Sequence, residues 1–135
     1  MKIKLKPPTF LLKGMEMENI ETTLFKKYLS NQTHKKYLLW IDDIRPIPND
    51  YISAYHVIIA KSYKEAIIKL NSMKFDVICL DHDLGKDFTG YDICKYIIEH
   101  NIQCPEYRIH TSNIVGRQNM TQLLSRYTKS LIRQC

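Results

Sequence analysis

Short apolar runs alternate with longer amphipathic segments along most of the chain. Four runs rich in β-branched and aromatic residues predict strands, at residues 37–41, 55–60, 75–80 and 107–110. Between and after them, apolar residues recur every three or four positions, which predicts helices over 62–70, 89–97 and 114–131. Strands that alternate with helices indicate right-handed crossovers and a mostly parallel central sheet. We therefore expect an α/β three-layer sandwich that ends in a helix, without a further strand.

The first 36 residues form a different kind of segment, an N-terminal arm that precedes the main domain at 37–135. Apolar residues alternate with lysines near its start, and Pro7-Pro8 separates two short extended pieces expected at 3–5 and 9–12. Ile20, Leu24 and Tyr28 then recur at helical spacing, which predicts a helix over 15–30. No residue pattern in the arm points to chemistry.

Acidic side chains stand where two of the predicted strands end. Asp42 and Asp43 follow the first strand, and Asp81 and Asp83 follow the third. Because the carboxyl ends of parallel strands meet at one edge of a sheet, we expect these four side chains to lie together. Four neighbouring carboxylates cannot all stay ionised at neutral pH without a cation, and oxygen ligands suit Mg²⁺ or Mn²⁺. The alternative is that the residues after the third strand only form a turn.

Two histidines, His82 and His110, are expected at the same edge of the sheet. Imidazole titrates near neutral pH, so a pair of histidines beside carboxylates predicts a general acid and a general base. Asp81 completes the predicted catalytic set. The alternative is that each histidine is satisfied by hydrogen bonds in the core or supports a ligand from behind.

Six residues at or near this edge are predicted to bind phosphate: Arg45, Thr111, Ser112, Asn113, Gly116 and Arg117. Asn113 is suited to cap the last helix, whose first free amides favour a phosphate, and Gly116 would let a ligand approach closely. The two arginines can pair with phosphate through two nitrogens, although each could instead be a solvated surface side chain. Trp40, Tyr91 and Tyr107 are expected to pack rather than to stack on bases.

Chain length, net charge and cysteine content restrict the class of protein. A chain of 135 residues suits one domain, and a net charge of +6 favours an anionic partner such as a nucleotide, although lysine is also a common solvated residue. No basic stripe with interleaved aromatics occurs, so we expect no stable binding of long RNA. The 4 cysteines lack metal-binding spacing, which favours reduced thiols. With no apolar stretch of about 20 residues and no signal-peptide core, we expect a soluble, cytoplasmic protein.

Four ordered motifs between Tyr37 and Tyr127 together resemble the cyclic-phosphate processing receiver domain, a divergent branch of the receivers of two-component signalling. They are LWIDDIRP at 39–46, LDHDLG at 80–85, TGYD at 89–92 and HTSNIVGRQNM at 110–120. Ile114 stands where the family pattern has proline, and the sequence lacks the lysine that ends the fifth strand of receivers. The resemblance implies a receiver-like, flavodoxin-like fold over 37–135 and an enzyme that acts on cyclic phosphates at RNA ends or on related nucleotides.

We therefore expect a metal-assisted phosphoesterase that hydrolyses a cyclic phosphate on RNA ends or a related nucleotide. The carboxylates would hold Mg²⁺ or Mn²⁺, with Asp83 in direct contact or behind the ligands, and His82 and His110 would transfer protons. A mechanism with the two histidines and no metal would leave the carboxylates unexplained. The alternative from another class is a receiver-like signalling or nucleotide-binding module without catalysis, in which Asp81 accepts a phosphoryl group or the crevice only holds a nucleotide. A third alternative is an interaction module without catalytic activity.

Overall fold

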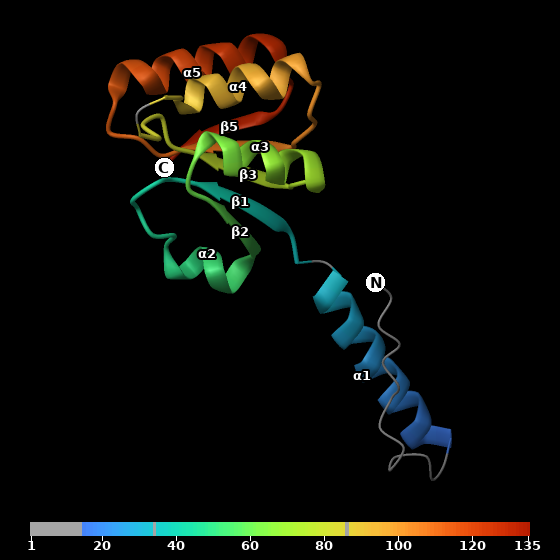
Figure 1. The fold of residues 1–135 in the computed structure, drawn as a ribbon. Coiled ribbons are helices and arrows are strands. Elements are labelled where there is room, and N and C mark those ends of the chain that lie inside the picture. The colour runs from blue at the N-terminus through green and yellow to red at the C-terminus, as the bar shows by residue number, and fades with distance from the viewer. Residues whose placement is uncertain (1–14, 34, 86) are drawn as a thin grey trace. The chain divides into compact units, whose positions relative to one another are not determined.

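The computed structural model describes residues 15–33, 35–85 and 87–135, and the chain divides into two units, Met1–Lys35 and Lys36–Cys135. In the first unit, helix α1 (Met15–Thr33) occupies the region where the sequence predicts a helix (Figure 1). The extended pieces expected at 3–5 and 9–12 lie outside the described residues. The second unit contains the sheet and every candidate functional residue.

The second unit is built on a parallel sheet of five strands. They are β1 (Tyr37–Ile41), β2 (His56–Ala60), β3 (Val77–Leu80), β4 (Glu106–Ile109) and β5 (Leu131–Gln134). Their spatial order is β2-β1-β3-β4-β5, and each neighbouring pair is parallel. The chain thus winds outward from β1 in both directions, and the strand order reverses between β1 and β3. In open α/β sheets, ligands bind outside the carboxyl ends of the strands at this reversal.

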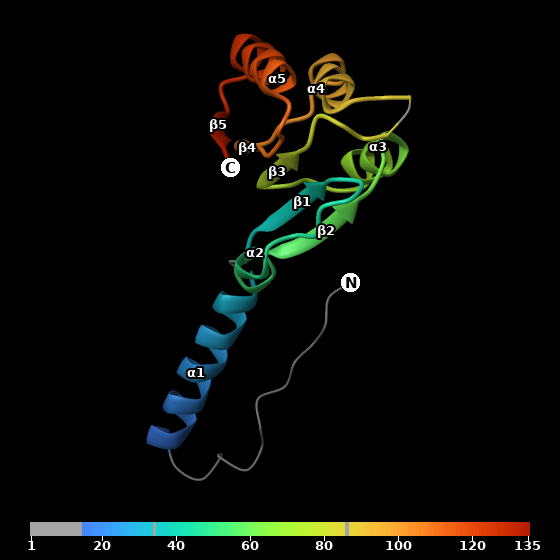
Figure 2. The same ribbon diagram turned by 90° about the vertical axis from the view of Figure 1, so that its left-hand side faces the viewer.

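Helices cover both faces of the sheet. They are α2 (Asn49–Ala54), α3 (Tyr63–Ser72), α4 (Gly90–Glu99) and α5 (Ile114–Tyr127). The turned view shows α3, α4 and α5 on one face, while α2 lies on the other (Figure 2). These three layers confirm the α/β receiver-like sandwich that the alternating pattern predicts.

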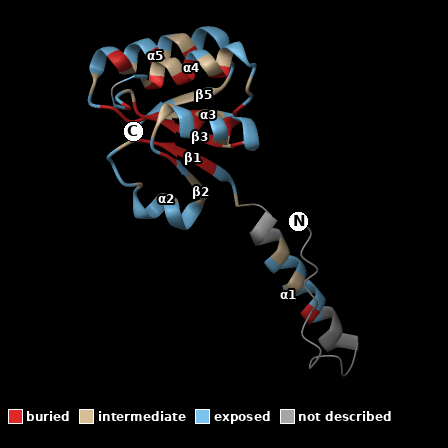
Figure 3. Cartoon of the chain, in the orientation of Figure 1, coloured by how far each residue is buried: buried red, intermediate tan, exposed pale blue. Residues whose placement is uncertain are grey.

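The core has two parts because the central strands are buried on both faces. On the side of α3, α4 and α5, residues such as Leu39 and Ile78 pack with the apolar stripes of the helices. On the other side, Leu38, Trp40 and Val77 form a smaller cluster that the α2 region covers. Burial is accordingly concentrated in the central strands (Figure 3). This two-sided burial explains why the strands appear in the sequence as unbroken apolar runs.

Strand β5 corrects the expectation of a sheet that lacks its last strand. Leu131 continues the three-and-four spacing of α5 in the sequence, but the helix ends at Tyr127. The Leu131 N–H donates to the Pro105 carbonyl (3.0 Å), and Arg133 pairs with Glu106 (2.9 Å). Because most side chains of this edge strand are exposed or half-buried, it carries no clear apolar signal. The helix expected over 114–131 is therefore shorter, and a strand follows it.

Helix α2 is a second element that the sequence did not predict. The prolines at 46 and 48 indicate extended chain, and Pro48 is extended at the N-cap position (φ −61°, ψ 143°). The helix starts directly after it, with Asp50 in its first turn, where a negative charge is favourable. Only 6 residues long, it is too short for a visible periodicity.

Side-chain caps fix where the longer helices begin, at the carboxyl edge of the sheet. The Ser62 hydroxyl accepts the Glu65 N–H (3.1 Å) at the start of α3. At the start of α4, the Thr89 N–H donates to the Asp92 carboxylate (2.8 Å). The Asn113 side chain accepts the Gly116 N–H (2.9 Å) at the start of α5. The caps place three helix N-termini around the edge where the acidic residues lie.

Candidate functional site

Three of the four predicted acidic residues come together at the carboxyl edge of the sheet. Asp42 and Asp43 directly follow β1, and Asp81 directly follows β3. Because Ile41 and Leu80 are register partners on adjacent parallel strands, the residues after them leave the sheet side by side. One oxygen from each of the three carboxylates lies within 4.8 Å of the other two. This spacing suits ligands of one hard divalent cation.

Asp42 is the most firmly held of the three carboxylates. One of its oxygens accepts the N–H groups of Ile44 (2.9 Å) and Arg45 (2.7 Å), and the other faces Nε2 of His110 (3.1 Å). The residue is only 3% exposed. These bonds fix the direction in which the carboxylate can offer its remaining lone pairs to a cation.

Asp81 carries negative charge that the protein does not balance. Burial raises the pKa of its carboxyl, and the neighbouring charge of Asp42 raises this pKa further. Hydrogen bonds from Thr111 and from the backbone of the following residues act in the opposite direction without cancelling the effect. Among the described residues, no lysine or arginine forms an ion pair with Asp43 or either of these two. A divalent cation would supply the missing charge, so the donor set fits Mg²⁺ or Mn²⁺.

Asp83 lies outside this group of carboxylates. Its side chain is 64% exposed, and its oxygen lies 3.0 Å from Nδ1 of His82. Its backbone forms an isolated bridge to Thr89, directly before α4. The structure therefore brings together Asp42, Asp43 and Asp81 and leaves Asp83 as a partner of the histidine.

His82 lies against the first turn of α5. A Cβ atom added to Gly116 would meet ring carbons of His82 at 2.4 Å, so only glycine leaves room for this imidazole. His82 thus fills the space beside the Cα atom of Gly116, where the sequence predicts the close approach of a phosphate. This contact gives a packing reason for glycine at position 116, which only the position of His82 in the fold reveals, and a role of Gly116 in phosphate binding stays a prediction.

The proton on His82 can be assigned from its neighbours. The Asn113 oxygen accepts the Gly116 N–H (2.9 Å), so the Asn113 NH₂ group points toward Nδ1 of His82 (3.2 Å). The Asp83 carboxylate lies closer to Nδ1 (3.0 Å) and can only accept, so in the neutral ring Nδ1 carries the proton and donates to Asp83, and Nε2 carries none. Protonation of Nε2 leaves this bond to Asp83 in place and gives the carboxylate a positively charged partner. Nε2 has no hydrogen-bond partner among the residues that the structure describes, which leaves it free for a substrate.

His110 has a different environment. Its imidazole stacks on Trp40 with a centroid distance of 4.0 Å and an interplanar angle of 6°, and the residue is 4% exposed. Burial lowers its pKa to about 4, although the charge of Asp42 and the hydrogen bond to it oppose this shift. The ring is therefore neutral near pH 7 and donates from Nε2 to Asp42, while Nδ1 is buried without a partner in the described part of the chain. This geometry suits a residue that positions Asp42 better than one that exchanges protons with a substrate.

The loop after β4 contains three of the predicted phosphate-binding residues, Thr111, Ser112 and Asn113. Thr111 is buried and its hydroxyl accepts the N–H of the cap residue Asn113 (3.2 Å), whereas Ser112 is exposed. Arg45 donates to the carbonyl of His110 (3.3 Å), and Arg117 donates to the carbonyl of Thr111. Each guanidinium group thus lies beside the backbone of this loop and donates one hydrogen bond to it.

The three aromatic residues expected to pack do so. Tyr107 is fully buried, Trp40 is 3% exposed, and Tyr91 packs against the core. Another aromatic pair, which the sequence did not predict, is Tyr63 and Phe88, whose ring centroids are 4.2 Å apart. The sequence signal that could have indicated this pair was Phe88, an apolar residue between the polar residues Asp87 and Thr89.

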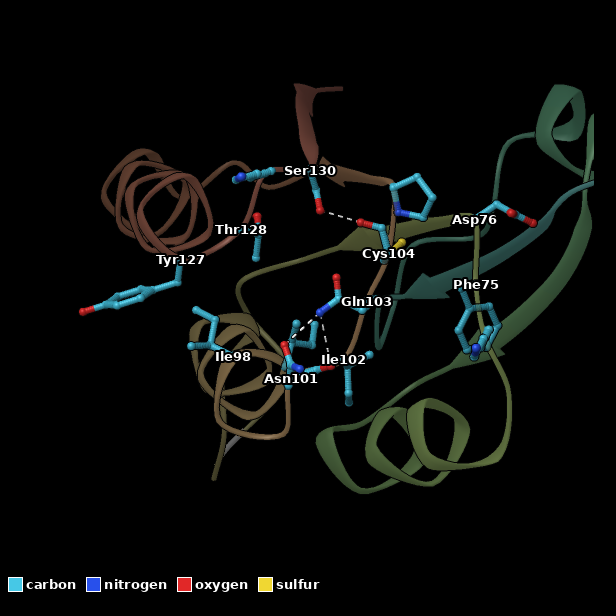
Figure 4. A pocket seen from close by; sticks show the side chains of 14 residues that line it. Phe75, Asp76, Ile98, Asn101, Ile102, Gln103, Cys104, Tyr127, Thr128 and Ser130 are labelled. Atoms are coloured by element: carbon cyan, nitrogen blue, oxygen red, sulfur yellow. Dashed lines mark hydrogen bonds between the residues drawn. The ribbon is translucent and has the colours of Figure 1, made fainter.

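A cavity of about 640 Å³ lies at the opposite, amino edge of the sheet, between the ends of α4 and α5 (Figure 4). Its polar groups largely bond to one another, as Ser130 does to the Cys104 carbonyl and Gln103 to Asn101 (2.8 Å). None of the predicted functional residues lines it. The chemistry-bearing side chains are gathered at the carboxyl edge instead.

A comparison with protein families decides between the receivers at large and their divergent branch. The family model for the cyclic-phosphate processing receiver domain matches residues 37–126, which is more than half of the 135 residues. The chain belongs to this family. The matched range contains the three clustered aspartates, both site histidines and the loop after β4. No match was found among curated proteins.

Solved structures similar to this cyclic-phosphate processing receiver domain are receiver proteins of low sequence identity. A CheY-like receiver from Methanospirillum hungatei has a TM-score of 0.56 and 17% identity, with coverage of 73% of this chain and 81% of that chain. TrrA from Thermotoga maritima, in complex with Mg²⁺-BeF, has a TM-score of 0.54 and 19% identity over 74% of this chain and 87% of that chain.

A response regulator from Burkholderia pseudomallei has a TM-score of 0.53 and 18% identity over 73% of this chain. That structure contains a phosphorylated aspartic acid, a calcium ion and citrate, and this chain spans 59% of its length. At these identities the likeness shows the receiver fold. In the described part of the receiver domain and its arm, no helix has the length and apolar character needed to cross a membrane.

Proposed function

We propose that this receiver domain is a divalent-cation-dependent phosphoesterase that opens a cyclic phosphate on an RNA end or a related nucleotide. One observation carries the proposal: three carboxylates converge within 4.8 Å, and no lysine or arginine of the described residues pairs with them as a counter-charge. A cluster of this kind is costly unless it binds a cation. Membership in a family named for cyclic-phosphate processing supports the choice of substrate.

Asp42, Asp43 and Asp81 would hold Mg²⁺ or Mn²⁺ at the carboxyl edge. The cation would supply positive charge to the phosphoryl oxygens and favour ionisation of the attacking water. His110 orients Asp42 through its Nε2 hydrogen bond (3.1 Å), and the Asp42 carboxylate is thereby fixed before the cation arrives.

His82 would transfer protons through Nε2. Its ring is fixed by Gly116 on one side and by the Asp83 carboxylate at Nδ1, so Nε2 is held in one direction and, in the neutral ring, can accept a proton. Asp83, 3.0 Å from Nδ1, would stabilise the imidazolium that forms when Nε2 takes a proton. We thus assign the acid–base step to His82 alone, and His110 has the role of positioning Asp42.

The phosphate would bind at the start of α5. The exposed hydroxyl of Ser112 and the first amides of the helix, at Ile114 and Val115, lie at this N-terminus, where the helix dipole favours an anion. Arg45 and Arg117 are held next to the loop by their bonds to its carbonyls, and their remaining N–H groups would neutralise developing charge.

A panel of cyclic phosphates tests the proposal. Nucleoside 2′,3′-cyclic phosphates, an RNA oligonucleotide with a 2′,3′-cyclic end, an ADP-ribose cyclic phosphate and 3′,5′-cyclic nucleotides are incubated with Mg²⁺, Mn²⁺ or EDTA. Chromatography should detect a ring-opened monoester from at least one of them, only when a cation is present. Absence of turnover across the panel, or turnover that is unchanged in EDTA, contradicts the proposal.

A second candidate function is that of a receiver-like module in which Asp81 accepts a phosphoryl group. The position of Asp81 directly after β3, bonded to Thr111, favours this candidate. Gln134, the last residue of β5, argues against it, because receivers carry a lysine at the end of this strand. Mass spectrometry after incubation with acetyl phosphate and Mg²⁺ separates the two, since a stable adduct on Asp81 favours the receiver.

A further inference from the structure

Tyr63 and Phe88 form an aromatic pair with one open side. Their ring centroids are 4.2 Å apart and the planes differ by 18°, so the two rings stack almost face to face. Tyr63 packs against the main core and is half-buried, whereas Phe88 is outside both core clusters and remains 47% exposed. Phe88 therefore has one face on Tyr63 while much of the ring remains open to solvent.

Both residues belong to segments that adjoin the acidic site. Tyr63 is the first residue of α3, which follows β2, and the last residue of that strand, Ala60, accepts the Asp42 N–H through its carbonyl (3.1 Å). Phe88 stands directly before Thr89, whose backbone bridges to Asp83. The aromatic pair thus borders the carboxyl edge on the side of α3 and α4.

Contacts within the described residues leave much of the Phe88 ring uncovered. A hydrophobic residue directly before an N-cap often packs on the fourth residue of the helix, which here is Ile93. Ile93 is fully buried, and the ring on which Phe88 stacks is that of Tyr63. The uncovered part of the ring lies beside the polar site, so a ligand in that site can cover it and gain the free energy of burying apolar surface.

We infer that the open face of Phe88 binds the base of the nucleotide whose cyclic phosphate enters the acidic site. This inference rests on the proposed function and deepens it by adding a base-binding subsite. The phosphate and the base of one nucleotide are separated by a ribose, which lets the base reach a rim while the phosphate lies at the carboxylates. Stacking uses the π-face that every base has, so the subsite accepts all four bases.

Binding measurements with a matched pair of ligands test the subsite. Isothermal titration in Mg²⁺ compares adenosine 2′,3′-cyclic phosphate with 1-O-methylribose 2′,3′-cyclic phosphate, which lacks the base. Phe88→Ala should weaken binding of the nucleotide about 5- to 150-fold, the usual range for one stacked base, and leave the base-free ligand unchanged. Phe88→Trp should retain affinity, and Phe88→Leu should lose most of it.

Tyr127→Ala is the matched control. Tyr127 is equally aromatic and 59% exposed, but it lies at the amino edge of the sheet, beside the cavity of Figure 4. Tyr127→Ala should change neither the affinity for the nucleotide nor the affinity for the base-free ligand. Melting temperatures of all variants establish that each is folded in the assay.

The outcomes separate this inference from the proposed reaction. Loss of nucleotide affinity in Phe88→Ala without any hydrolysis by the wild type keeps the subsite and rejects the reaction. Hydrolysis with equal affinities of wild type and Phe88→Ala keeps the reaction and overturns the subsite. A wild type that binds both ligands equally well, or binds no nucleotide, also overturns it.

Discussion

The imidazole of His110 lies flat against the indole of Trp40, with ring centroids 4.0 Å apart. The same imidazole donates to Asp42, one of the three carboxylates of the candidate cation site, while the indole N–H donates to the Arg45 carbonyl (3.1 Å). Trp40 is the only tryptophan in the chain. Its fluorescence therefore reports on the acidic site without a label, and a bound cation or a charged imidazole beside it should change the emission.

Replacing His110 with alanine should destabilise the domain and weaken cation binding. A buried oxygen of Asp42 loses its donor, which costs roughly 1–3 kcal/mol of unfolding free energy. The loss of turnover should be recovered in part by raising the Mg²⁺ concentration, because His110 orients a ligand rather than carrying protons. His100→Ala, at the exposed C-cap of α4, should leave cation binding and turnover unchanged. It should cost about 1 kcal/mol of unfolding free energy, because it removes only a hydrogen bond and a ring stack to Tyr96. A turnover loss that no Mg²⁺ concentration relieves would instead make His110 a proton carrier.

Stability should fall on acidification below the ordinary pKa of histidine. Burial lowers the pKa of His110 from 6.5 to about 4, so between these values the unfolded chain binds a proton that the native state does not. The contribution is complete above pH 6.5 and is lost as the pH falls toward 4. From pH 7 to 5, urea unfolding followed by Trp40 fluorescence should show a loss of about 2 kcal/mol. His110→Gln, which lacks the titrating ring, should lose less, and an equal loss in both proteins would exclude His110 as the source.

The contact between His82 and Gly116 predicts an unusual result for an alanine substitution in a helix. Glycine to alanine ordinarily stabilises a helix by about 1 kcal/mol. At position 116 the added Cβ would lie 2.4 Å from the His82 ring, so Gly116→Ala should instead destabilise the domain by roughly 1–3 kcal/mol. It should also reduce turnover by displacing the imidazole. Ser125→Ala, at an exposed position of the same helix, should be neutral or slightly stabilising in the same unfolding experiment.

Removing the charge of Asp81 should have opposite effects on stability with and without a cation. The raised pKa of Asp81 means that its ionised form is penalised at neutral pH, so Asp81→Asn should melt at or above the wild type in EDTA. In millimolar Mg²⁺ the wild type should gain several degrees and the variant should not, because ligand binding stabilises only the native state. Asp83→Asn is the control and should keep the gain, since Asp83 lies outside the carboxylate group. Identical melting of the wild type in EDTA and Mg²⁺ would falsify the cation site.

Much of the fold could be predicted because the buried strands are continuous apolar runs. The run at 37–41 coincides with β1, and the runs at 55–60 and 75–80 contain β2 and β3. The elements missed, α2 and β5, are short and largely exposed, so their formation depends on tertiary contacts such as the Arg133–Glu106 pair. A local pattern cannot contain such contacts.

The site could be predicted in its composition but not in its geometry. The rule that parallel strands end at one edge was enough to bring Asp42 and Asp81 together. It could not separate the roles of the two histidines, because the difference arises from the ring of Trp40 and the first turn of α5. It also could not show that Asp83 points toward His82 and away from Asp81. Asp83 lies two residues beyond Asp81, and the conformation of the loop after β3 decides its direction.

Cation binding and hydrolysis can be measured together in one sample. Mn²⁺ is titrated into protein with a nucleoside 2′,3′-cyclic phosphate, bound Mn²⁺ is followed by electron paramagnetic resonance, and the monoester is measured by chromatography. We predict one bound Mn²⁺ per chain and a hydrolysis rate that rises in proportion to occupancy. Asp81→Asn should lose both, whereas the control Tyr127→Ala should keep both. Hydrolysis that proceeds without bound Mn²⁺, or an Asp81→Asn variant that still binds it, would contradict a cation-dependent reaction at the three carboxylates.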